Sequence, residues 1–136
     1  MTITGPIPEN IRRLMPPETR KELNAPTIAE AQAKTDAKLE RELQKQIANY
    51  LRQRDIWFAW QRMDRKATGT KGQPDFLCVI NGYPVALEVK TLRGKLSPDQ
   101  EHCHAAMRAS GWLVYVVRSV AEVKELVEFW KRKLAE

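Results

Sequence analysis

The chain has 136 residues, of which 43% are hydrophobic and 29% are charged. This composition fits one globular domain with a single core. It excludes a membrane-spanning protein, because no apolar run approaches the roughly 20 residues that a transmembrane helix needs. The formal net charge of +6 at pH 7 favours a polyanionic partner such as nucleic acid.

The N-terminus has neither the basic nor the apolar region of a signal peptide, so we expect a cytoplasmic protein. The two cysteines, Cys78 and Cys103, form no Cys-x-x-Cys pair, which argues against a disulfide scaffold or a zinc ribbon. His102 and His104 flank Cys103, but consecutive residues of a helix point about 100° apart and cannot converge on one ion. We expect filling and surface roles for these histidines.

Residues 1–26 hold most of the prolines and show no sustained hydrophobic period. This pattern predicts an extended or partly ordered arm, and the chain from residue 27 to residue 136 is predicted to form the single domain. Both disorder and packing along a partner subunit fit the composition of the arm.

A helix is predicted over residues 27–54, where Thr27 and Glu30 match a capping box. Apolar residues recur at helical spacing and are expected to form its buried stripe. These residues are Leu39, Leu43, Ile47, Tyr50 and Leu51.

Glu40 is predicted to lie at the edge of this buried stripe, because it precedes Leu43 by three residues and Ile47 by seven. A carboxylate on a packed face is unfavourable unless it has a partner. Glu40 is therefore a candidate for a functional site. Alternatively, it extends past the core into solvent or pairs with Lys38 or Gln44.

A strand is predicted over residues 55–63, where aromatic and aliphatic side chains alternate. Residues 64–73 then form a polar loop that lacks a Walker sequence. Cationic residues lie in and around this loop and just after residue 90, so we expect them to contact a DNA backbone. These residues are Arg62, Arg65, Lys66, Lys71, Arg93 and Lys95. An ordinary solvated loop is the alternative.

Residues 72–90 predict one β-hairpin with a two-residue turn at residues 81–82, an Asn-Gly pair between two apolar runs. Counting outward from this turn places Asp75 directly opposite Glu88. Pro84 supports the register, because it falls in a non-hydrogen-bonded pair where its missing N–H is not needed.

Asp75, Glu88 and Lys90 are predicted to share one face of this hairpin, since side chains alternate along a strand. The two carboxylates form a non-hydrogen-bonded pair, with Cα atoms about 4.5 Å apart, and they repel unless something neutralises them. A set of oxygen ligands favours Mg²⁺ or Mn²⁺ over zinc or copper. The alternative is a solvated strand face with no ion.

A second helix is predicted to begin at Ser97, with Pro98 in its first position and Gln100 completing a capping box, and to end near residues 110–111. Residues 112–118 are continuously apolar and predict a central strand, and a final helix follows. The predicted element order is α-β-β-β-α-β-α, an α/β protein.

The pair Pro74-Asp75 followed by Glu88-Val89-Lys90 resembles the signature of the PD-(D/E)XK nucleases. The surrounding blocks at residues 72–77, 87–90, 96–100 and 111–118 resemble the VRR-NUC branch, the virus-type replication and repair nucleases, and the likeness extends from about residue 39 to residue 127. It implies a restriction-endonuclease-like αβββαβ core with a mixed central sheet flanked by helices, plus a C-terminal helix.

The resemblance also implies a Mg²⁺- or Mn²⁺-dependent DNA endonuclease of bacterial or phage type. Its small stand-alone members act as homodimers on branched DNA such as Holliday junctions, in DNA repair and recombination. Asp75, Glu88 and the backbone carbonyl of Val89 are implied to hold the ion. Glu40 matches the first-helix glutamate of the superfamily and is implied to bind through water or a second ion.

Lys90 is implied to orient or deprotonate the attacking water, and Gln100 matches a family residue near the active site, in addition to its role in the capping box. Two alternatives stay open. One is a nuclease that trims flaps, nicks duplexes or cuts like a restriction enzyme. The other is a DNA-binding module without hydrolysis, which gives no reason for Asp75, Glu88 and Lys90 all to be present.

Overall fold

The computed structural model describes residues 27–61 and 71–133. The chain falls into two compact units, residues 1–39 and 40–136, and helix α3 (Ile28–Gln53) crosses the boundary between them. In the first unit, the predicted capping box is confirmed: the N–H of Thr27 donates to Glu30 Oε2 at 3.0 Å and the N–H of Glu30 donates to Thr27 Oγ1 at 3.1 Å. The predicted arm over residues 1–26 lies outside the described residues.

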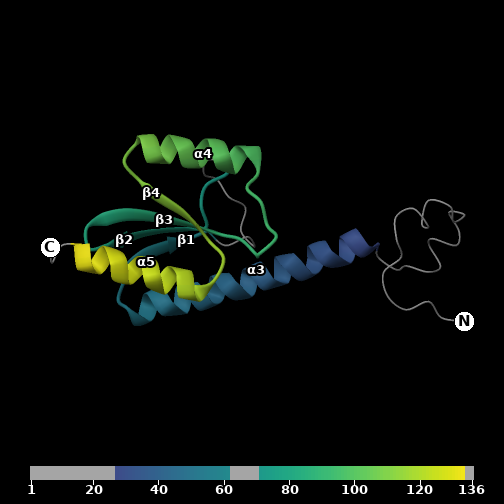
Figure 1. Cartoon of the computed structure of the whole chain (residues 1–136), viewed down its shortest axis with the longest axis horizontal. Helices are drawn as coiled ribbons and strands as arrows, with labels where there is room; N and C mark the ends of the chain where they lie inside the picture. The colour runs from purple at the N-terminus through teal and green to yellow at the C-terminus, as the bar shows by residue number, and fades with distance from the viewer. Residues whose placement is uncertain (1–26, 62–70, 134–136) are drawn as a thin grey trace, which may run out of the picture. The chain divides into compact units, whose positions relative to one another are not determined.

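The second unit is built on one four-stranded mixed sheet, which confirms the predicted α/β class (Figure 1). After α3 come β1 (Phe58–Trp60), β2 (Phe76–Ile80), β3 (Tyr83–Val89), α4 (Pro98–Ala109), β4 (Leu113–Val117) and α5 (Val120–Lys133). The strand order is β1-β2-β3-β4, with β3 and β4 parallel and the other neighbours antiparallel. Within the described residues, no helix is both long enough and apolar enough to cross a membrane.

The β2–β3 hairpin has the predicted register, with Phe76 opposite Leu87 at the far end of the ladder and Pro84 in its expected place opposite residue 79. Asn81 and Gly82 both adopt positive φ angles, 55° and 86°, as a tight hairpin turn with the twist of the strands requires. If this register is continued by one position, Asp75 lies opposite Glu88.

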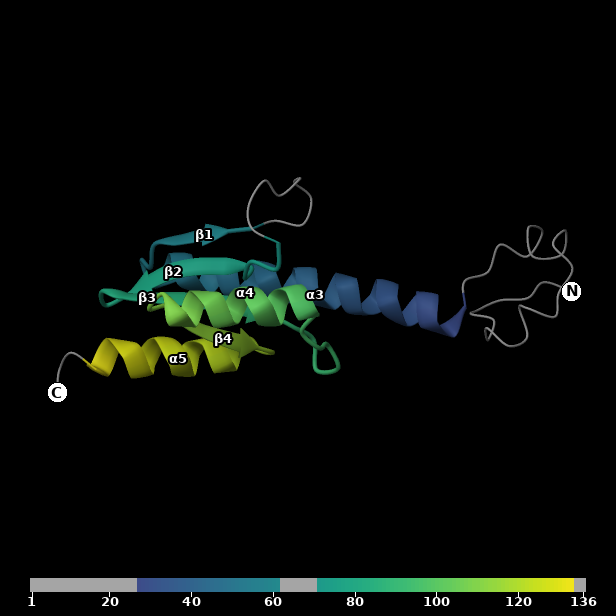
Figure 2. The same ribbon diagram turned by 90° about the horizontal axis from the view of Figure 1, so that it is seen from above.

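Helices cover both faces of this sheet: α4 packs on one face, and α5 with the second half of α3 packs on the other (Figure 1). Figure 2 shows the sheet from the side of α4. The core under α3 and α5 is almost entirely aliphatic and aromatic. Its fully buried members include Ile47, Leu51, Phe76, Ile80, Leu87, Val117, Val123 and Val127. The other face of the hairpin lies toward α4 and includes Leu77 and Glu88.

Two predicted strands differ from the structure. Among the described residues, the first strand is Phe58–Trp60, and residues 62–63 of the predicted strand lie outside them. It begins late because the residues before it end α3 in a Schellman motif: Asp55 has a positive φ of 54°, and the N–H of Ile56 donates to the Leu51 carbonyl at 3.0 Å. The apolar strand β4, predicted to be central, lies at the edge of the described sheet. β4 is apolar because α4 and α5 both pack against it.

The predicted stripe of α3 is correct except at Leu39, whose side chain is 54% exposed. Ile47 and Leu51 are fully buried, and Leu43 and Tyr50 pack against the core. The apolar repeat of the sequence therefore begins before the first buried residues of the helix.

Candidate active site

Asp75 lies just before β2, and its side chain reaches across to β3. Its Oδ2 atom accepts a hydrogen bond of 2.8 Å from the N–H of Val89. This bond draws the carboxyl group across to the end of β3, where Glu88 and Val89 lie side by side in the chain. The Asp75 carboxyl is thus fixed by the backbone next to the other predicted ligands.

Gly72 holds the segment before Asp75 against the first turn of α4. Its φ is +83°, and a Cβ atom built on it would lie 2.2 Å from the carbonyl oxygen of Asp99. Only glycine accepts both the left-handed backbone and this close approach. The glycine therefore sets how near the Asp75 segment lies to the helix that carries Gln100.

Glu88 is the most buried charged side chain of the site, with 1% of its surface exposed. Its Oε1 atom accepts a hydrogen bond of 2.8 Å from Gln100 Nε2 and lies 3.6 Å from Lys90 Nζ. Its Oε2 atom lies 3.6 Å from His104 Nε2 and has no hydrogen-bond partner among the described residues. One carboxyl oxygen is therefore held in place by a hydrogen bond, while the other is buried beside His104 without one.

Gln100 forms the predicted helix cap and also contacts Glu88. Its Oε1 atom accepts from the N–H of Ser97 at 2.9 Å, and its own N–H donates to Ser97 Oγ at 3.2 Å, which completes the capping box. The amide nitrogen is then free of the cap and reaches Glu88. The first turn of α4 therefore orients the Glu88 side chain through Gln100.

Burial and neighbouring carboxyl groups raise the pKa values of Glu88 and Asp75. Burial raises the pKa of Glu88 to about 8, helped by the charge of Asp75 and opposed by Lys90. Burial also raises the pKa of Asp75 to about 6, against the hydrogen bond from Val89 and the charge of Lys90. Buried carboxyl groups whose pKa values are raised in this way are common at functional sites.

Lys90 is held in place with only 12% of its side chain exposed. Its N–H donates to the carbonyl of Val117 at 3.0 Å, and a Cβ on Gly94 would come within 3.3 Å of the lysine stem. The guanidinium of Arg118 donates to the carbonyls of Thr91 and Gly94, and so fixes the turn that follows the lysine. The ammonium group is thereby directed back toward Glu88.

Glu40 joins the site through electrostatics. Its side chain is half-buried, and its pKa is raised by burial and lowered by the positive charge of Lys90. Its charge in turn raises the pKa of Asp75 and Glu88. Glu42, two residues on, is exposed and lies 3.7 Å from Lys45. Glu40 therefore lies near the site, whereas Glu42 faces solvent.

A comparison with known protein families matches residues 9–121 to the VRR-NUC domain. The chain belongs to the VRR-NUC family. A solved structure described as a VRR_NUC domain is 26% identical, with a TM-score of 0.53, and the match covers 66% of this chain and 95% of that one. The comparison with curated proteins found no match. Membership indicates a nuclease of the PD-(D/E)XK type that acts on DNA.

The predicted DNA-contacting residues of this VRR-NUC chain divide into two groups. Arg62, Arg65 and Lys66 lie outside the described residues. The described ones, Lys71, Arg93 and Lys95, are all exposed, and Lys71 Nζ lies 3.4 Å from Asp99 Oδ2. Their exposure fits the expected contact with phosphates, which remains a prediction.

The VRR-NUC site suits a hard divalent cation that keeps part of its water. No three His, Cys, Asp or Glu side chains within residues 27–61 and 71–133 form a complete cage for an ion. Mg²⁺ needs no such cage, because it binds through one or two carboxylates together with water and substrate phosphate. Asp75 and Glu88, two buried carboxyl groups with raised pKa values, fit this requirement.

His104 was expected to fill space or lie on the surface, and it is fully buried. Its place against Glu88 was not predicted, and neither ring nitrogen has a hydrogen-bond partner among the described residues. One signal was available: His104 follows Gln100 by four residues, which places both on the same face of a helix. This spacing alone does not predict that His104 is buried against the carboxyl group of Glu88.

Proposed function

We propose that this protein is a divalent-metal-dependent, structure-selective endonuclease that hydrolyses phosphodiester bonds in branched DNA, with Holliday junctions as its main substrate. The observation that supports this most is the meeting of Asp75, Glu88 and Lys90 at the open end of the hairpin. Like charges in this arrangement favour a cation, and an ammonium group beside them suits the chemistry of a phosphate.

Asp75, Glu88 and the carbonyl of Val89 hold the ion in this proposal, and Glu40 contributes through water or a second ion. Mg²⁺ or Mn²⁺, when bound, polarises the scissile phosphate and lowers the pKa of water. Gln100 keeps Glu88 in one orientation through its 2.8 Å hydrogen bond. The capping box in turn prevents Gln100 from rotating away, so the ligand is positioned before an ion arrives.

Lys90 orients the attacking water or accepts its proton, and its charge offsets the negative charge that develops on the phosphorane. Water forms one bond to phosphorus as the bond to the leaving sugar oxygen breaks, so no oxidant or second substrate is needed. The lysine is suited to this because its stem is packed while its ammonium group lies 3.6 Å from Glu88 Oε1.

Branched DNA and a homodimer are proposed on the resemblance of the chain to small VRR-NUC proteins. A dimer presents two cutting centres to two strands, which is what the resolution of a four-way junction requires. The net charge of +6 and the exposed Arg93 and Lys95 support binding to phosphates near the site.

The experiment incubates labelled duplex, flap, splayed and four-way DNA with the protein and Mg²⁺, Mn²⁺ or EDTA. We expect metal-dependent cutting, strongest on the four-way substrate, and a loss of about 100-fold or more in Lys90→Ala. Lys45→Ala is the matched control, because it removes the same charge from an exposed position on α3. Preferred cutting of flaps or duplex would support the other nuclease functions, and tight binding without cutting would support a DNA-binding module.

A further inference from the structure

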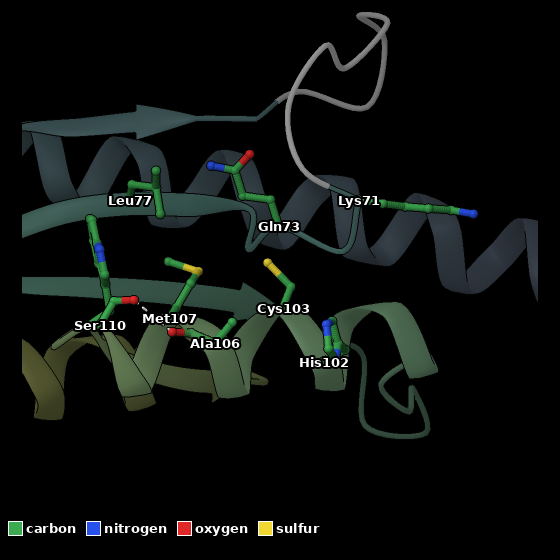
Figure 3. Close-up of a pocket in the computed structure, with 9 residues that line it drawn as sticks. Lys71, Gln73, Leu77, His102, Cys103, Ala106, Met107 and Ser110 are labelled. Atoms are coloured by element: carbon green, nitrogen blue, oxygen red, sulfur yellow. Dashed lines mark hydrogen bonds between the residues drawn. The ribbon is translucent and has the colours of Figure 1, made fainter.

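A pocket of about 390 Å³ opens between β2 and α4 (Figure 3), and neither Asp75 nor Glu88 lines it. Leu77 extends into it from the strand, and Cys103, Ala106 and Met107 extend into it from the helix. Trp112, which follows α4, also lines it. Its volume lies within the roughly 300–1,000 Å³ of small-molecule sites.

The residues that line the pocket are neighbours in the sequence of residues of the candidate active site. Gln73 lines the pocket and precedes Asp75 by two residues, while Cys103 lines it and precedes the histidine that faces Glu88. Lys71 and His102 lie at the end of the pocket near the first turn of α4, which is the end that carries Gln100 (Figure 3). The pocket therefore adjoins the candidate active site at the start of α4, where Gln100 contacts Glu88.

The floor of the pocket suits a flat, weakly polar group. Leu77, Met107 and Trp112 offer aliphatic, thioether and aromatic surfaces, against which a phosphate would lose its water without gaining partners. A nucleobase instead gains from stacking on an aromatic ring and from contact with sulfur. Gln73 and His102 at the rim carry polar groups that suit the edges of a base.

We propose that this pocket receives one unstacked nucleobase of the DNA strand that is cut. The inference rests on the proposed nuclease function and adds to it a reason for the preference for branched substrates. A base inside a duplex must leave its stack and its pair before it can enter, whereas a base at a branch point has less to lose. Lys71, exposed at the rim, is placed to contact the neighbouring phosphate.

Two alanines of α4 provide a matched test. Ala106 lines the pocket and Ala105 does not, and both are exposed on the same helix. Leucine at either position keeps the helix propensity high and adds no π-face that could stack on DNA. Ala106→Leu therefore fills the pocket, while Ala105→Leu makes the same chemical change outside it.

The measurement combines these variants with DNA that lacks single bases. Four-way junctions carrying one abasic nucleotide at each position around the cut are titrated by fluorescence anisotropy against Lys90→Ala protein, so that cutting does not interfere. At one position, loss of the base should weaken binding roughly five- to 100-fold. The same loss should persist in Ala105→Leu and largely vanish in Ala106→Leu, since the filled pocket no longer holds a base.

Equal abasic effects in Ala105→Leu and Ala106→Leu, or no sensitive position with the parent protein, would overturn the pocket inference. Metal-dependent cutting of intact junctions by the wild type would continue in that case, so the proposed nuclease function would stand. Junction binding without any cutting by the wild type would overturn the nuclease function instead. Unchanged thermal unfolding of Ala106→Leu confirms that a loss of binding does not come from misfolding.

Discussion

Gln100 donates a hydrogen bond of 2.8 Å to Glu88 while its side-chain oxygen caps α4 through the N–H of Ser97. One side chain therefore links the start of a helix to the buried carboxyl group of the site. The two functions can be separated by substitution, because the cap uses the oxygen of the amide and the glutamate uses its nitrogen.

Gln100→Glu should keep the capping oxygen, lose the donor and place a second carboxylate beside Glu88. We expect cutting to fall by about tenfold or more, since a hydrogen bond to a charged group contributes about 1.5–3 kcal/mol. Ser97→Ala should show the reverse pattern: it loses about 0.5–2 kcal/mol of unfolding free energy with the loss of the cap and keeps most of its activity. Activities that simply follow the melting temperatures of both variants would contradict a separate role for Gln100.

The stability of the metal-free protein should fall as pH rises. Glu88 has a pKa of about 8 in the folded protein against an ordinary 4.5, so the folded state binds more protons between these values. The free energy of unfolding therefore decreases as pH rises from about 4.5 to about 8. Thermal unfolding in EDTA at pH 5.5, 7 and 8.5 measures this decrease, and Mg²⁺ should reduce it.

Glu88→Gln is the control for this pH dependence, because it keeps the size of the side chain and cannot ionise. Its melting temperature in EDTA should change less between pH 5.5 and 8.5 than that of the wild type. An identical slope in the two proteins would show that other groups cause the effect.

Gly72→Ala should reduce both stability and activity. A left-handed backbone alone disfavours alanine by about 1–2 kcal/mol, and the new Cβ would also meet the Asp99 carbonyl at 2.2 Å. Gly82→Ala is a control for the backbone effect alone, since Gly82 has a φ of +86° with nothing within 4 Å of its Cβ position. Urea unfolding should therefore show the larger loss for Gly72→Ala, and only this variant should displace Asp75 and lower cutting. Equal losses would mean that the loop moves away from α4 without difficulty.

His104→Leu should separate stability from function. The ring is fully buried with neither nitrogen hydrogen-bonded among the described residues, and replacing unsatisfied polar groups with an apolar side chain of similar size is often neutral or stabilising. We expect an unfolding free energy within about 1 kcal/mol of the wild type or higher. The Mg²⁺ concentration needed for half-maximal cutting should rise several-fold, because Glu88 loses the neighbour that limits its orientation. An unchanged Mg²⁺ requirement would reduce His104 to a packing residue.

The sequence was sufficient for the hairpin and for the pair of carboxylates, because a two-residue turn and the missing N–H of Pro84 leave one register. The helix caps were also predictable, since they depend on residues three positions apart. The edge position of β4 was not, because an apolar strand covered by two helices has the same composition as a central strand. The approach of Gly72 to Asp99 and the burial of His104 against Glu88 depend on how α4 lies on the sheet, which no local pattern specifies.

The central claim is that Asp75 and Glu88 together bind one divalent ion. Its most direct test is calorimetric titration of Mn²⁺ into the wild type, Asp75→Asn and Glu88→Gln, with Glu42→Gln as a control at an exposed carboxylate. We predict that the wild type and the control bind Mn²⁺ alike, and that each of the other two variants binds at least about tenfold more weakly. Unchanged Mn²⁺ affinity in both Asp75→Asn and Glu88→Gln would contradict it.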